Sequence, residues 1–357
     1  MKKTLQKLIS FKSITQDRGE NNKILNWVKD QIKDLPLFFN EIESNGVKSL
    51  VVTTQETKNP KLFLMGHLDV VPGSDSLFKA KIKDGKLFGR GASDMKFATA
   101  CYLKLLKELG QDLKKYNFGV IWTTDEEVGG LNGTKAVKDA GYKADVYFLP
   151  DGGKNWNIEN EAKGVWHLKI KARGKSGHGS RPWEGENAIE ELMSFLIELK
   201  KHFPISENRK HYHRTLNIGK IKGGEATNKI PDYAEANIDI RYLPQEGKEK
   251  IENILNLVKK DFSGIEIESL IMGNSFAVDQ NNQYIQIVKN IIEKNLGKKS
   301  NFEFSHGASD ARFFQESPVV LVRPNGGNLH AENEWVDLKE LDDFYLLVKF
   351  FVEKVAK

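Results

Sequence analysis

The sequence predicts an α/β protein, with a mixed, mainly parallel sheet flanked by helices and an inserted α+β domain of the ferredoxin-like type. In the N-terminal and C-terminal parts of the sequence, short apolar segments alternate with amphipathic helical patterns, which is typical of a parallel sheet with helical connections. After Gly164 the pattern changes to the order βαββαβ, a complete ferredoxin-like unit. We therefore expect a discontinuous larger domain, residues 1–163 and 273–357, and an inserted domain, residues 164–272.

The first part of the chain supplies most of the predicted parallel sheet. Its apolar segments are short enough to be buried strands, and the helical patterns between them are long enough to connect parallel strands. The predicted strands are 50–53, 61–65, 118–123 and 146–149, and the predicted helices are 22–32, 95–108 and 133–140.

The middle of the chain has a different periodicity. Residues 166–172 alternate apolar and polar side chains, as expected of a strand with one face in solvent. The remaining elements predicted here are a helix 187–203, strands 215–221 and 233–242, a helix 248–262 and a strand 265–271. The α/β pattern then resumes with a helix 283–295, a strand 319–322 and a helix 338–355.

The composition excludes several classes of protein. Hydrophobic residues make up 39% of the chain and charged residues 29%, which is typical of a globular protein. The net charge of +5 is spread along the sequence, whereas a nucleic-acid-binding protein usually gathers its basic residues on one face. Cys101 is the single cysteine, so intrachain disulfides and cysteine-rich zinc sites are excluded. With no apolar signal core before Lys12 and no membrane-length apolar run, we expect a cytoplasmic protein without membrane or nucleic-acid partners.

Acidic residues and a histidine follow the predicted strands. His67 and Asp69 come after strand 61–65, Glu126 and Glu127 after strand 118–123, and Asp151 after strand 146–149, while Asp94 opens a helix. Because sites in open α/β sheets form at the carboxyl ends of the strands, these side chains should converge on one edge of the sheet.

Each cluster has a simpler interpretation when it is taken alone. Asp94 could cap the helix that follows it, and Asp151 before two glycines is a turn signature. Together they favour a metal site, because cations would neutralise so many neighbouring carboxylates. Asp69 could then fix the tautomer of His67, and adjacent Glu126 and Glu127 could face a bound water and a metal respectively.

Four motifs resemble those of the M20 family of metallopeptidases, and the similarity runs over essentially the whole chain. They are Gly66-His67-Leu68-Asp69-Val70-Val71-Pro72, Gly89-Arg90-Gly91-Ala92-Ser93-Asp94-Met95-Lys96, Thr124-Asp125-Glu126-Glu127-Val128-Gly129 and His330-Ala331-Glu332-Asn333-Glu334. The family includes desuccinylases, deacetylases, carboxypeptidases and di- and tripeptidases.

The resemblance implies a site with two divalent metal ions in the larger, catalytic domain. Asp94 would bridge both ions, with His67 and Asp151 completing one and Glu127 and His330 the other. Asp69 would orient His67, and Glu126 would act as general base and then acid. Such nitrogen and oxygen ligands suit Zn²⁺ first, with Mn²⁺ or Co²⁺ as substitutes. His330 is assigned by the resemblance alone.

The inserted domain resembles the lid and dimerisation domain of the family. The resemblance gives His178 a role in stabilising the tetrahedral oxyanion, often across a dimer interface, so we expect a homodimer through this domain. It also suggests Asn228, Arg241, Ser309 and Arg312 as substrate contacts, although Arg312 could equally form a structural salt bridge.

The expected activity is hydrolysis of an amide bond in a small peptide. An N-acyl amino acid deacylase of the desuccinylase or deacetylase type is the alternative. Aspartate at position 151 favours peptides with a free amino end, whereas the short inserted domain and Arg241 favour the deacylase. A non-catalytic binding protein on the same fold is a remote third interpretation, because no expected ligand is missing and Glu126 is present.

Overall fold

The computed structural model describes residues 1–205, 208 and 211–357. The chain divides into two compact units. The first comprises Met1–Asn160, Val278–Phe304 and Ser309–Lys357, and the second comprises Glu161–Ala277 and Ser305–Ala308.

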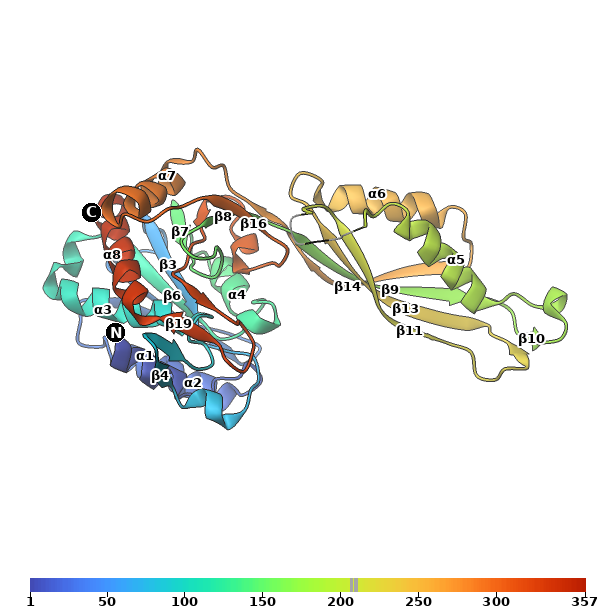
Figure 1. Ribbon diagram of the computed structural model, residues 1–357, viewed down its shortest axis with the longest axis horizontal. Helices are drawn as coiled ribbons and strands as arrows, with labels where there is room; N and C mark the ends of the chain where they lie inside the picture. Colours follow the sequence, from blue (N-terminus) through green and yellow to red (C-terminus); the bar gives the residue numbers. More distant parts are fainter. Residues whose placement is uncertain (206–207, 209–210) are drawn as a thin grey trace. The chain divides into compact units, whose positions relative to one another are not determined.

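The first unit is built on a six-stranded sheet of order β1-β2-β6-β3-β7-β17 (Figure 1). The strands β6, β3, β7 and β17 are parallel, whereas β1 and β2 form an antiparallel hairpin that joins the sheet against β6. The mainly parallel sheet predicted from the apolar segments is therefore confirmed. The strands are β1 (Phe38–Ser44), β2 (Val47–Thr53), β3 (Leu62–His67), β6 (Phe118–Thr123), β7 (Val146–Phe148) and β17 (Val319–Val320).

Helices cover this sheet and bury their apolar faces on it. Helix α3 packs on β3 and also contacts α1 and α8, while α2 and α4 contact β2. Asp17 caps α2 and Asp337 caps α8 through their side-chain oxygens, which satisfies backbone N–H groups that a helix start leaves free. The helices are α1 (Lys2–Ile9), α2 (Arg18–Asp30), α3 (Lys96–Leu109), α4 (Thr134–Asp139), α7 (Gln283–Asn290) and α8 (Leu338–Val355). Helix α7 continues as a π-helical turn, Ile291–Asn295, so the predicted helix 283–295 is present in two forms.

Two smaller sheets lie outside the six-stranded sheet. One has the order β18-β19-β5-β4, and the other has the order β15-β8-β16. Their strands are β4 (Lys81–Lys83), β5 (Lys86–Phe88), β8 (Ile158–Ala162), β15 (Phe276–Ala277), β16 (Phe302–Ser305), β18 (Gly326–Gly327) and β19 (Trp335–Asp337). The sequence patterns did not predict these strands.

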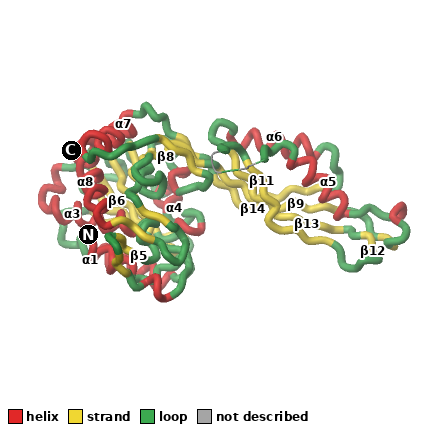
Figure 2. Tube along the Cα trace, viewed as in Figure 1, coloured by secondary structure: helices red, strands yellow, loops and turns green. Residues whose placement is uncertain are grey.

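The second unit is a four-stranded antiparallel sheet of order β11-β13-β9-β14, drawn in yellow in Figure 2. Its elements follow the chain order β9, α5, β11, β13, α6, β14. A short ribbon of β10 and β12 lies outside this sheet. The bounds are β9 (Gly164–Arg173), β10 (Gly177–His178), α5 (Ala188–Lys200), β11 (Thr215–Gly223), β12 (Lys229–Ile230), β13 (Tyr233–Tyr242), α6 (Gly247–Lys259) and β14 (Ile265–Gly273).

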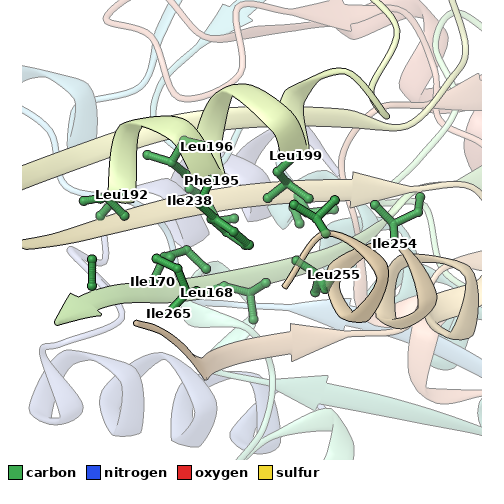
Figure 3. Close-up of a cluster of buried hydrophobic side chains, with 14 of the residues drawn as sticks. Leu168, Ile170, Leu192, Phe195, Leu196, Leu199, Ile238, Ile254, Leu255 and Ile265 are labelled. Atoms are coloured by element: carbon green, nitrogen blue, oxygen red, sulfur yellow. The ribbon is translucent and has the colours of Figure 1, made fainter. Parts of the chain in front are cut away.

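The core of the second unit lies between one face of this sheet and its two helices. Residues in β9 and β13 alternate between buried and partly exposed, which is the pattern predicted for a sheet with one covered face. Leu168, Ile170 and Ile238 from the strands meet Phe195 of α5 and Leu255 of α6 (Figure 3). Among the described helices, none is long and apolar enough to cross a membrane.

Candidate metal centre

Three parallel strands of the first unit deliver the predicted side chains to one edge of the sheet. β3 pairs in parallel with both β6 and β7, and His67 is the last residue of β3. Glu126 and Glu127 lie in a 3₁₀ turn after β6, and Asp151 follows β7. The side chains therefore gather because the carboxyl ends of parallel strands point the same way.

Two groups of possible ligand atoms form at this edge. His67, Glu126 and Asp151 make one group, and Asp94, Glu127 and His330 make the other. Within each group one donor atom per residue lies within 4.8 Å of the others. Every predicted ligand is present in one of the two groups, and Glu126 joins His67 and Asp151.

Asp94 contacts both groups. Its Oδ1 lies 3.2 Å from Nε2 of His67, and its Oδ2 lies 3.3 Å from Nε2 of His330. Nε2 of His330 is also 3.1 Å from Oε2 of Glu127. One carboxylate therefore presents a separate oxygen to each group, an arrangement that a bridging ligand can use. Helix α3 begins at Lys96 and its cap residue, Met95, makes no side-chain capping bond, so the alternative capping role of Asp94 is not seen.

Asp69 contacts His67 of the first ligand group through its backbone oxygen, and it contacts the turn of Glu126 and Glu127 through its carboxylate. Its backbone oxygen lies 3.0 Å from Nδ1 of His67, whereas its carboxylate Oδ1 is 3.5 Å away. Nδ1–H can donate to this carbonyl, which leaves Nε2 to face Asp94. The carboxylate instead accepts hydrogen bonds from the backbone N–H groups of Glu126 and Glu127, at 3.3 and 3.2 Å. Asp69 thus holds the turn that carries both glutamates.

Burial and mutual repulsion shift the pKa values of these groups. Burial raises the pKa of Glu126 well above its usual range, and Asp151 adds to the effect. Burial likewise raises the pKa of Asp151, with Asp94 as the next cause. Although burial alone would raise the pKa of Asp94, hydrogen bonds from His330 and His67 hold it below its usual value. The same bonds to Asp94 and Glu127 raise the pKa of His330 to about 10. Positive charge is therefore strongly favoured within this ring of carboxylates.

The backbone bends at Asp151 and Gly152. Gly153 adopts a φ of +70°, which a glycine tolerates without strain. Arg323 donates from Nε to the Gly153 carbonyl at 2.7 Å. Sequence reasoning missed Arg323, because an isolated arginine after a short strand carries no pattern.

Sequence reasoning also missed a role for Arg90 and Glu334, although both lie in the quoted motifs. They form a buried ion pair with an Nη1–Oε2 distance of 2.9 Å. Their position inside the motif that contains Asp94 and the motif that begins with His330 was the available signal.

The two remaining candidates in the first unit have different surroundings. Ser309 is buried, and its hydroxyl has no hydrogen-bond partner among the described residues. Arg312 donates from Nη2 to the carbonyl of Gly129 at 2.6 Å, in the turn that follows Glu127. Arg312 therefore holds this turn through a backbone oxygen.

The other candidates lie in the second unit. His178 is exposed, and its Nδ1 accepts a hydrogen bond from the backbone N–H of Ser180 at 3.2 Å. The carbonyl of Asn228 accepts a hydrogen bond from Gly179 at 2.8 Å. Arg241 forms a two-pronged pair with Asp239, at 2.9 and 3.2 Å.

Comparison with known proteins places the chain in a family. Residues 63–357 match the model of peptidase family M20/M25/M40. A succinyl-diaminopimelate desuccinylase from Rickettsia akari is 28% identical, with 98% of each chain covered. Another from Pelagibacter ubique is 30% identical, with 87% of each chain covered. The crystal structure of aminopeptidase PepT from Bacillus cereus shares the fold, with a TM-score of 0.80, 23% identity and coverage of 98% of this chain and 96% of that chain. These findings confirm the resemblance seen in the motifs: the chain belongs to peptidase family M20/M25/M40 and is a metal-dependent amide hydrolase.

Proposed function

We propose that this protein hydrolyses an amide bond of a small peptide or N-acyl amino acid at a site for two divalent metal ions. The observation that supports this most directly is the contact of Asp94 with both ligand groups through separate oxygens. The ligands in this proposal are His67, Asp94, Glu127, Asp151 and His330.

The donor set fits such ions. It offers imidazole nitrogens and carboxylate oxygens and no sulfur, which suits Zn²⁺ first and Mn²⁺ or Co²⁺ as substitutes. The buried carboxylates would otherwise repel one another. Bound there, the ions would polarise the scissile carbonyl and lower the pKa of a water molecule.

Glu126 is the proposed general base. The carboxylate of Asp69 holds its backbone N–H at 3.3 Å, and burial gives the side chain a pKa well above its usual range. A carboxylate with a raised pKa accepts a proton more readily and can later donate it. Glu126 would take a proton from the attacking water and pass it to the leaving nitrogen.

Two substrate classes have support, and each rests on a different observation. The relatives from Rickettsia akari and Pelagibacter ubique are named as desuccinylases, which favours an N-acyl amino acid. The aspartate at position 151 favours a short peptide with a free amino end only through the family resemblance, because aspartate is common at this position in aminopeptidase-like and dipeptidase-like members.

A panel of N-succinylated and N-acetylated amino acids and of di- and tripeptides separates these classes. The full-length protein is assayed with added Zn²⁺ or Mn²⁺. Turnover of acylated amino acids alone would support the deacylase and contradict the peptidase, and the reverse result would do the opposite. No turnover of any amide by protein that binds metal would contradict the proposed function.

We propose that the second unit is a ferredoxin-like lid and dimerisation domain. Its element order and its strand order β11-β13-β9-β14 are those of the ferredoxin-like unit. Nδ1 of His178 lies 3.2 Å from the backbone N–H of Ser180 and 2.8 Å from the Ser180 hydroxyl. In the neutral tautomer in which Nδ1 accepts from both groups, Nε2 carries the proton. His178 thus presents an exposed donor of the kind that stabilises a developing oxyanion.

Apolar side chains on the outside of the second unit support a dimer through this domain. Met193 and Ile197, one turn apart on α5, are 50% and 61% exposed, and Ile221 on the edge strand β11 is 56% exposed. Exposed apolar residues and an unpaired strand edge are both features of surfaces that associate with another chain.

Multi-angle light scattering of the protein and of the Ile197→Glu variant tests this dimer. We expect a dimer that the variant converts to a monomer, because a buried charge disfavours association. A fully active monomeric wild-type protein would contradict it.

A further inference from the structure

We propose that Arg90 and Glu334 are positioning residues, whose buried ion pair holds three loops in the geometry that metal binding requires. This inference rests on the proposed function, in which Asp94 and His330 are metal ligands. Neither Arg90 nor Glu334 belongs to the ligand groups.

Glu334 organises the loop that ends in Asp94. Its side chain is fully buried and accepts four hydrogen bonds. Oε1 accepts from the backbone N–H groups of Ser93 and Asp94, at 2.9 and 3.1 Å, and Oε2 accepts from Gly91 N–H at 3.1 Å and from Arg90 Nη1 at 2.9 Å. Consecutive backbone N–H groups that converge on one anion form a rigid concave turn. Since one of these groups belongs to Asp94 itself, Glu334 acts directly on the backbone of the bridging ligand.

Arg90 ties the same loop to two other segments. Nη2 donates to the backbone oxygen of His330 at 3.0 Å and to that of Pro72 at 3.3 Å. Nη1 also lies 3.4 Å from the Ala331 oxygen. The planar guanidinium thus connects the segment that follows β3, the loop before α3 and the loop that carries His330.

The backbone of His330 shows why such a connection is needed. Its φ is +64°, in the left-handed region that residues with a side chain rarely adopt. Such a conformation persists when surrounding contacts enforce it. The bond from Arg90 to the His330 carbonyl is one of these contacts, and it helps to aim the imidazole at Asp94 and Glu127.

The physical chemistry of the pair favours positioning over stability. A buried ion pair loses about as much free energy in desolvation as it gains from attraction, so replacing both partners by apolar residues often leaves stability unchanged, whereas removing one partner leaves a buried unpaired charge and destabilises the fold. A lysine could keep the positive charge of Arg90, but its single ammonium cannot reach the same oxygens in a fixed plane. Groups that orient metal ligands in this way typically affect metal affinity by about 10- to 100-fold.

The test compares three full-length variants: Glu334→Gln, Arg90→Lys and a control, Glu340→Gln. Glu340 lies on α8 of the same unit and also accepts several bonds, from Trp156 Nε1 at 2.8 Å, Asn325 N–H at 2.7 Å and Lys298 Nζ at 3.2 Å. The Zn²⁺ dissociation constant of the metal-free protein is measured by chelator competition, and urea unfolding midpoints are measured in parallel.

We expect Glu334→Gln and Arg90→Lys to weaken Zn²⁺ binding by about 10- to 100-fold. Glu340→Gln should lower the unfolding midpoint while leaving Zn²⁺ affinity unchanged. Unchanged affinity in Glu334→Gln would overturn the inference, as would an equal loss in the Glu340→Gln control. Wild-type affinity in Arg90→Lys would show that charge alone suffices and would overturn the role of the guanidinium plane.

A fourth variant, His330→Ala, separates this inference from the function on which it rests. If His330→Ala leaves Zn²⁺ binding unchanged, the proposed metal centre is wrong. If His330→Ala abolishes binding at one site while Glu334→Gln binds normally, the metal centre stands and only the positioning role fails.

Discussion

Replacing Glu159 by glutamine should stabilise the protein at pH 8 far more than at pH 5. Glu159 lies in β8 and is 7% exposed, and its Oε2 accepts a hydrogen bond from Gly153 N–H at 3.1 Å. Burial raises the pKa of this carboxyl to about 7. Glutamine keeps the accepting oxygen and nearly the same shape but cannot ionise.

The sign and size of the pH-dependent change in the free energy of unfolding follow from proton linkage. The folded-state pKa of about 7 exceeds the ordinary value of 4.5 for a glutamate, so the folded protein binds more protons than the unfolded chain between these two pH values. The wild-type free energy of unfolding therefore falls as pH rises through this range. With 1.36 kcal/mol for each pKa unit, the loss between pH 5 and pH 8 is about 2.5 kcal/mol. The Glu159→Gln variant should not show this fall in the free energy of unfolding, because glutamine does not ionise.

Urea unfolding of metal-free wild-type and variant protein at both pH values measures the effect. Because all other titrating groups are shared, they cancel in the difference between the two proteins. Glu41→Gln is the control: Glu41 is paired with Lys29 at the surface, and this hydrogen bond lowers its pKa. Its substitution should destabilise slightly at pH 8, by less than about 1 kcal/mol. An equal stability difference for Glu159→Gln at pH 5 and pH 8 would refute the reasoning.

Three further outcomes are expected. Glu126→Gln should bind Zn²⁺ like the wild type but lose at least about 100-fold in kcat, because a general base is absent; unchanged turnover would remove Glu126 from the mechanism. Dialysis against a chelator should abolish turnover and added Zn²⁺ should restore it, whereas activity that survives complete metal removal, checked by elemental analysis, would contradict a metal-dependent reaction. Phe195→Ala should destabilise the second unit by about 3–5 kcal/mol in urea unfolding, since Phe195 is fully buried. The control Leu257→Ala, at a 55% exposed position of α6, should change stability by less than about 1 kcal/mol; equal effects would show that Phe195 is not a core residue.

The elements that could be predicted are those in which the pattern of apolar and polar residues shows which side chains are buried. β3 and β6 are continuously buried, so their apolar segments stand out in the sequence. The alternation of β9 could be read for the same reason. In contrast, β1 has no buried residue, and it forms a strand because β2 pairs along its whole length. The strands β4, β5, β18 and β19 have only two or three residues each, too few to show a period.

Some residues of the candidate site could likewise be predicted from the sequence, and others could not. The positions of His67, Glu127 and Asp151 could be predicted because His67 ends the buried strand β3, and Glu127 and Asp151 come within four residues of the ends of β6 and β7. His330 lies in a loop without a preceding strand signal, and only the family resemblance indicated it. For Asp69, the sequence indicated a partner of His67, but the structure brings the backbone oxygen closer than the carboxylate. Backbone oxygens carry no residue-specific signal.

The sequence by itself determined the mainly parallel sheet, and it indicated the edge at which the acidic residues gather. These features follow from the spacing of apolar residues within each segment and from the direction of parallel strands. Both depend on residues that are close together in the sequence. Only the tertiary structure decided that Asp94 faces both histidines and that Arg90 and Glu334 join three loops. The bonds from Arg90 to His330 and from Asp94 to Glu334 link residues 240 positions apart, and the geometry of hydrogen bonds between distant loops exists only after the chain has folded.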